Sequence, residues 1–180
     1  MSLWRAIKRA WRGWRAILGG SPEWQGQFAP TMPGLVTALG IFLLCAFISI
    51  IVSALSFGVP TFDGFLGVMF VQALGLIALL VGTVTTRQAV PTPAPLLQII
   101  VPGLYALGFY LVLGALLSLV NGMLVFVLWA GLIYLFYRLG RVAAGWAHGV
   151  SLAFGCLTVV LLAALPMTLY MLMSTFAPLS

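Results

Sequence analysis

The chain has 180 residues, of which 63% are hydrophobic and 6% are charged, and its net charge is +6. Because polar residues are so few, they cannot cover the surface of a globular domain in water. The composition therefore excludes a soluble domain. It predicts an all-α integral membrane protein, a bundle of five transmembrane helices preceded by an amphipathic interfacial helix. The basic residues lie among tryptophans or at the ends of apolar segments, which favours anionic lipid headgroups over nucleic acid as the partner.

Residues 1–20 predict a basic amphipathic helix that lies on the membrane surface. At about 100° per residue, one arc of its helical wheel is apolar: Leu3, Trp4, Ile7, Trp11, Trp14 and Leu18. A neighbouring arc is basic: Arg5, Lys8, Arg9, Arg12 and Arg15. This pattern is typical of helices lying in the lipid interface, so we expect the tryptophans and basic residues to bind lipid. Ala6, Ala10 and Gly13 form a third side, which either seats a partner protein or faces water.

Residues 21–33 are expected to form an interfacial linker, with Trp24 and Phe28 at the interface. The transmembrane domain follows at 34–173, and 174–180 form an outer tail. A bilayer crossing needs roughly 20 apolar residues, which predicts spans at 34–57, 64–86, 96–119, 123–137 and 146–173. The linker, the transmembrane domain and the tail together account for residues 21–180.

The charges set the expected orientation. This threading places every Lys and Arg on one side and Asp63 on the other, so the positive-inside rule predicts a cytoplasmic N-terminus and a periplasmic C-terminus. Seven arginines against one lysine, in a chain rich in Ala, Gly, Leu and Val, favour a bacterial inner membrane.

Small residues mark the expected helix-packing faces, because they let helix backbones approach closely within lipid. Gly67, Gly75 and Gly82 follow one side of the second span, and Gly145, Gly149 and Ala153 recur every fourth residue at the fifth. A similarity between residues 33–40 and 102–108 is either a trace of internal duplication or a chance match between Leu/Gly/Ala-rich segments.

His148 is the sole histidine of the sequence, and it lies four residues after Ala144. This Ala-x-x-x-His pattern resembles the short motif of light-harvesting polypeptides, in which the histidine ligates the magnesium of bacteriochlorophyll and the small residue leaves room for the ring. The resemblance covers two residues and implies a pigment site at His148. The alternative is an interfacial histidine that hydrogen-bonds a loop carbonyl or water.

Arg87, Arg138 and Arg141 also have two interpretations. They either gather into a pocket for an anionic lipid or act separately as stop-transfer residues that extend to headgroups.

Reactive groups are scarce in the sequence. The spans contain no acidic residue, and the chain has no phosphate-binding loop, no Cys/His metal spacing and no assembled triad. Cys45 and Cys156 lie in apolar spans and predict no disulfide. We therefore expect no enzymatic activity, no metal site and no certain cofactor beyond bound phospholipid.

Two classes of function, and a third idea, remain after these exclusions. The first is a non-catalytic accessory or assembly subunit of a larger inner-membrane complex, such as a photosynthetic or respiratory one, with other membrane-protein subunits as partners. The second is a small lipid-handling or permease-like protein. The third is membrane shaping by the N-terminal helix.

Overall fold

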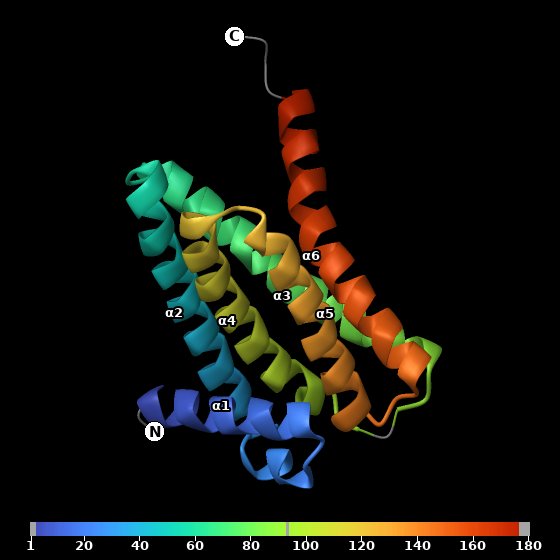
Figure 1. Cartoon of the computed structure of the whole chain (residues 1–180). Coiled ribbons are helices and arrows are strands. Elements are labelled where there is room, and N and C mark those ends of the chain that lie inside the picture. The colour runs from blue at the N-terminus through green and yellow to red at the C-terminus, as the bar shows by residue number, and fades with distance from the viewer. Residues whose placement is uncertain (1–2, 93, 177–180) are drawn as a thin grey trace.

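A computed structural model of the chain describes residues 3–92 and 94–176 (Figure 1). These residues form α1 (Leu3–Gly19), the short 3₁₀ helix η1 (Pro22–Gly26), and five long helices: α2 (Met32–Phe57), α3 (Phe62–Ala89), α4 (Leu97–Val120), α5 (Leu124–Val142) and α6 (His148–Phe176). All five are long and apolar enough to cross a membrane. The predicted all-α membrane bundle of five spans is therefore confirmed. Of the expected tail, residues 174–176 belong to α6, and residues 177–180 lie outside the described part, as do residues 1, 2 and 93.

Local capping explains where α2 and α3 begin. Thr31 accepts a hydrogen bond from the N–H of Gly34, with Pro33 in the first turn, and Thr61 accepts one from the N–H of Gly64. A threonine oxygen that satisfies a free N–H, and a proline early in the first turn, both favour helix initiation.

The centre of the bundle is α4, whose residues 99–108 are all buried. It packs against α2 on one side and α5 on another, and α6 packs against α3 and α5. In Figure 1, α1 lies across the foot of α2 and α4, and the far end of α6 projects beyond the other helices. We call the end of the bundle that carries α1 the α1 end, and the other the opposite end.

Most helix boundaries lie one to three residues from the predicted ones, and the largest difference is at the end of the fourth span. The fourth span was expected to end at residue 137, but α5 continues to Val142, so Arg138 and Arg141 lie within the helix. Arginine is a good helix former, and charge alone does not end a helix. The fifth span was expected from 146 and begins at His148.

Candidate functional site

The side of α1 that packs on the bundle is the one with the small residues. Ala6, Ala10 and Ile17 are buried there, and the backbone at Gly13 lies so close to the Phe28 ring that a side chain would clash. Trp14 was expected among the lipid-facing tryptophans and is instead 5% exposed. Small residues allow close approach, so the Ala/Gly side, which was expected to seat a partner or face water, seats α1 on this chain's own bundle.

The other predicted lipid-binding residues of α1 remain on its outer surface. Trp4 and Trp11 are 65% and 60% exposed, and the Lys8 ammonium lies 5.1 Å from the centre of the Trp4 ring. The remaining basic residues are also exposed: Arg5, Arg9, Arg12 and Arg15. The chain thus leaves these side chains accessible to lipid.

The segment between α1 and α2 folds back beneath α1. Trp24 and Phe28, expected at the interface, are buried with 3% and 5% of their surfaces exposed. The Phe28 ring lies 5.8 Å from the ring of Tyr105 on α4. The expected linker is therefore part of the packed structure, because Trp24 is buried and the Phe28 ring lies between Gly13 of α1 and Tyr105 of α4.

Arg138 holds the C-terminal end of α1. One guanidinium nitrogen, Nη2, donates to the carbonyl oxygens of Ile17 at 3.0 Å and Leu18 at 2.7 Å. Gly20 follows with a positive φ of 73°, and the N–H of Ser21 donates to the carbonyl of Ala16. A cation at the negative end of a helix is favourable. Arg138 therefore supplies a donor to the carbonyl of Leu18 and a second donor to the carbonyl of Ile17, which also accepts from the N–H of Gly20.

The other two arginines fix separate loops. Arg87 Nη1 donates to the carbonyl of Ala94 at 2.6 Å, and Arg141 Nη1 donates to the carbonyl of Trp146 at 2.6 Å. The indole N–H of Trp146 in turn donates to Thr92 Oγ1 at 2.6 Å, which joins the α3–α4 loop to the α5–α6 loop. Within the described residues, the three arginines bind backbone carbonyls at three different places. Sequence reasoning missed the pair between Trp146 and Thr92, because no local pattern connects residues 54 positions apart.

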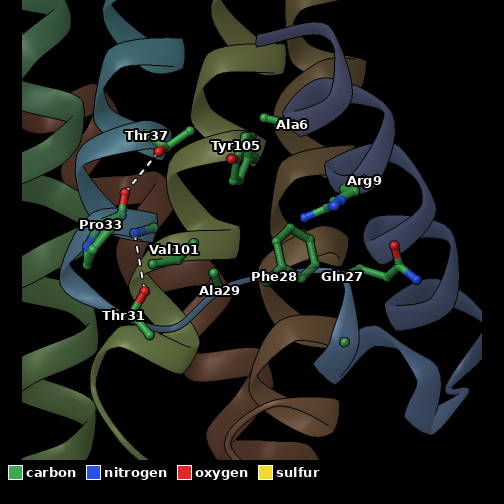
Figure 2. A pocket seen from close by; sticks show the side chains of 12 residues that line it. Ala6, Arg9, Gln27, Phe28, Ala29, Thr31, Pro33, Thr37, Val101 and Tyr105 are labelled. Atoms are coloured by element: carbon green, nitrogen blue, oxygen red, sulfur yellow. Dashed lines mark hydrogen bonds between the residues drawn. The ribbon is translucent and has the colours of Figure 1, made fainter. Parts of the chain in front are cut away.

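A cavity of about 370 Å³ lies beside α1, between residues 26–31 and the first parts of α2 and α4. Figure 2 shows Arg9 from α1 and Tyr105 from α4 around this space. Its polar lining comprises Arg9, Gln27, Thr31, Thr37 and Tyr105. Apolar groups, among them Ala6, Phe28 and Val101, line the rest. The cavity is thus amphiphilic and lies next to the most basic helix of the chain.

His148 is the first residue of α6 and is exposed. Its Nδ1 lies 2.7 Å from the hydroxyl of Tyr137, and the two rings are stacked. A groove of about 450 Å³ between α5 and α6 is lined by His148, Tyr137, Tyr134 and Gly149, among others. If Nδ1–H donates to the tyrosine oxygen, Nε2 keeps a lone pair that is able to ligate a metal.

The one-turn helical spacing that the light-harvesting resemblance requires is not formed. Ala144 is buried in the α5–α6 loop, and Gly145 follows it with a positive φ of 71°. Ala144 therefore does not lie one helical turn before His148. The small residue beside the histidine in the groove is Gly149.

The predicted packing residues fall into two groups. Gly75 and Gly82 face α6: a Cβ at Gly75 would lie 3.1 Å from Leu162, and one at Gly82 would clash with Thr158. Gly67 and Gly149 have no neighbour within 4 Å of such a Cβ, Gly145 lies in a loop, and Ala153 is exposed. The buried small residues of α6 are instead Ser151, Gly155 and Thr158.

The fold and this end of the bundle define a class: a helical membrane protein with an amphipathic N-terminal helix docked across one end of its bundle. No family model, curated protein or solved structure matches the chain. Within the described residues, no group of three or more His, Cys, Asp or Glu side chains is placed to hold a metal ion. What the site offers chemically is hydrogen bonding and positive charge.

Proposed function

We propose that this chain is a non-catalytic accessory subunit of a larger complex in the bacterial inner membrane, and that it binds a transmembrane helix of another subunit. The observation that carries this proposal is the far end of α6. Three large side chains on one face, Met167, Tyr170 and Met171, are 62%, 76% and 61% exposed. Figure 1 shows the C-terminal end of α6, to which these residues lead, projecting beyond the other helices.

Helix α6 is the longest helix within the described residues, one residue longer than α3. A helix of 29 residues at 1.5 Å per residue is about 43 Å long, whereas the hydrocarbon layer is about 30 Å thick. Apolar side chains that extend past the hydrocarbon favour coverage by protein over contact with headgroups. Methionine is suited to such a contact because its flexible side chain adapts to irregular surfaces.

The proposed orientation places the α1 end in the cytoplasm and the end of α6 in the periplasm. Arg87, Arg138 and Arg141 lie near the α1 end together with the five basic residues of α1, whereas Asp63 begins α3 at the opposite end. This distribution supports the orientation through the positive-inside rule. Single-cysteine labelling near residues 20 and 60, with an impermeant thiol reagent on cells and on opened cells and with Cys45 and Cys156 replaced by alanine, tests it. Labelling near residue 20 in intact cells contradicts it.

The experiment for the proposed subunit role measures particle mass. Polymer discs would be cut from the native membrane, and their protein content would be weighed by native mass spectrometry. We expect an assembly with other chains in fixed stoichiometry. A triple variant with Met167→Ala, Tyr170→Ala and Met171→Ala should instead appear as a lone chain, slightly lighter than the 19.3 kDa of the wild type.

The matched control removes three equally exposed side chains elsewhere on the bundle: Val36, Leu55 and Val120, which are 69%, 78% and 77% exposed. Their replacement by alanine should leave the assembly intact. A lone chain or a simple multiple of its mass in the wild type contradicts the proposal, and so does equal loss of the assembly in both triple variants.

A further inference from the structure

Two hydroxyl groups that line the cavity beside α1, those of Tyr105 and Thr31, have a hydrogen available to donate. Tyr105 is only 7% exposed, and its hydroxyl makes no hydrogen bond within the described residues. The Thr31 oxygen accepts from the N–H of Gly34, so the hydroxyl hydrogen of Thr31 remains available to donate. Buried polar groups normally find partners. The Tyr105 hydroxyl has apolar surroundings on most sides and faces the cavity on the remaining one. It therefore points to a ligand in the cavity that carries hydrogen-bond acceptors.

The charges around the cavity select an anion. Arg9 is exposed and also lines the cavity, so it lies at the mouth. None of the lining residues is acidic. Thr31, Pro33, Gly34 and Thr37 place the first turn of the 26-residue helix α2 against the same space, and the N-terminal end of a helix favours negative charge.

The size and apolar lining of the cavity favour a lipid over a free anion. A volume of about 370 Å³ is several times the roughly 30 Å³ that one water molecule occupies in the liquid, so it exceeds what a lone phosphate fills. Ala6, Phe28, Pro33 and Val101 supply an apolar wall for the excess space. A phosphate attached to glycerol and the first methylene groups of acyl chains matches both parts of this lining.

We infer that the cavity binds the phosphate of a membrane phospholipid, with Arg9 and Tyr105 donating hydrogen bonds to the phosphate oxygens and the apolar wall receiving the glycerol end. This site lies at the α1 end and does not depend on the proposed partner at the opposite end. The two proposals are therefore tested separately.

The experiment uses the full chain, purified in detergent and stripped of lipid. Short-chain phosphatidylglycerol, below its micelle concentration, would be titrated and its occupancy measured by native mass spectrometry. Arg9→Gln should weaken binding about tenfold, as for the loss of a charge-assisted hydrogen bond. Tyr105→Phe should weaken it about threefold, because one neutral hydrogen bond is lost.

Arg12→Gln is the matched control, because it removes the same charge from the same helix at an exposed residue that does not line the cavity. It should change the affinity less than about twofold. Equal weakening by Arg9→Gln and Arg12→Gln overturns the inference, since it shows attraction by the general surface charge. Displacement of the lipid by equimolar inorganic phosphate also overturns it, since the site then takes the free ion. Should Arg9→Gln fail to fold, Tyr105→Phe carries the test, and unchanged affinity in that variant refutes the site.

Discussion

Replacing Arg138 with Gln is expected to loosen the C-terminal end of α1 from the bundle. The guanidinium Nη2 donates to two consecutive carbonyls of that end, at 3.0 and 2.7 Å. A glutamine side chain is shorter and uncharged, so it loses both hydrogen bonds and the attraction to the negative end of the helix. The change leaves the apolar contacts of Ala10, Trp14 and Ile17 in place.

The size of the effect follows from three contributions. Hydrogen bonds from a charged group contribute about 1.5–3 kcal/mol each when buried, and partial exposure of Arg138 reduces the two together to roughly 2–3 kcal/mol. The charge at the end of the helix adds about 0.5 kcal/mol. Against this, Arg138 Nε is buried without a partner, and its removal regains about 1 kcal/mol. The net loss is about 2 kcal/mol, which corresponds to an undocked fraction of α1 about 30-fold larger.

Hydrogen exchange measured by mass spectrometry on the protein in lipid nanodiscs reports this undocking, because an undocked helix of 17 residues has lost its packing contacts and unfolds readily. Amides of residues 10–18 should exchange about 30-fold faster in Arg138→Gln than in the wild type, in proportion to the undocked fraction. Arg141→Gln is the control, because its guanidinium binds the carbonyl of Trp146 and leaves α1 untouched. Unchanged protection of α1 in Arg138→Gln, or equal acceleration in both variants, would refute the reasoning.

Three further substitutions test the packing. Gly82→Ala should lower the free energy of unfolding by about 1–3 kcal/mol, because the added Cβ would clash with Thr158. Gly67→Ala is the control and should not lower the stability, because its Cβ meets nothing within 4 Å. If thermal unfolding in detergent ranks the two variants in the opposite order, the observed α3–α6 contact is contradicted. Trp146→Phe keeps one aromatic ring but loses the bond to Thr92 and part of a buried side chain, so it should cost at least about 1 kcal/mol by the same assay. No change in stability would disprove the hydrogen bond between the two loops. Gln72→Leu loses a hydrogen bond to Ser49 but also removes a buried carbonyl oxygen that has no partner, so the stability should change by less than about 1 kcal/mol. A larger loss would mean that this oxygen has a hydrogen-bond partner in the membrane.

The spans could be predicted because the physics that sets them is local. A crossing needs a fixed length of apolar sequence, and each of the five apolar segments is long enough to supply it. The face that α1 presents to the bundle could not be predicted in the same way. By hydrophobicity, the arc with the tryptophans is the face of α1 expected to contact the bundle. Within lipid, however, the close packing of small side chains decides which helix faces meet. The contact therefore falls on Ala6, Ala10 and Gly13, and Trp14 is buried beside them.

The polar contacts at the α1 end depend on residues far apart in the sequence. Arg138 reaches carbonyls of residues 120 and 121 positions earlier, and backbone carbonyls carry no signature in a sequence. The same limit applies to α6, which offers more than one row of small residues. A Cβ at Gly155 would lie 2.7 Å from the carbonyl oxygen of Ile133, so close approach to α5 selects the row with Ser151, Gly155 and Thr158. The position of the α5 backbone makes that selection, and the sequence of α6 alone does not reveal that position.

The two ends of the bundle are held by different forces, and this separates their functions. At the α1 end, long-range hydrogen bonds from Arg138 tie α1 to α5, and one from Trp146 ties the α5–α6 loop to the α3–α4 loop. At the opposite end, the exposed side chains of α6 have no such ties within the described residues. Helix α4 has 24 residues, so it is about 36 Å long and separates the two ends by about that distance. Substitutions so far apart and without shared partners contribute independently. Changes at Tyr170 should therefore leave lipid binding at Tyr105 intact, and changes at Arg9 should leave assembly intact.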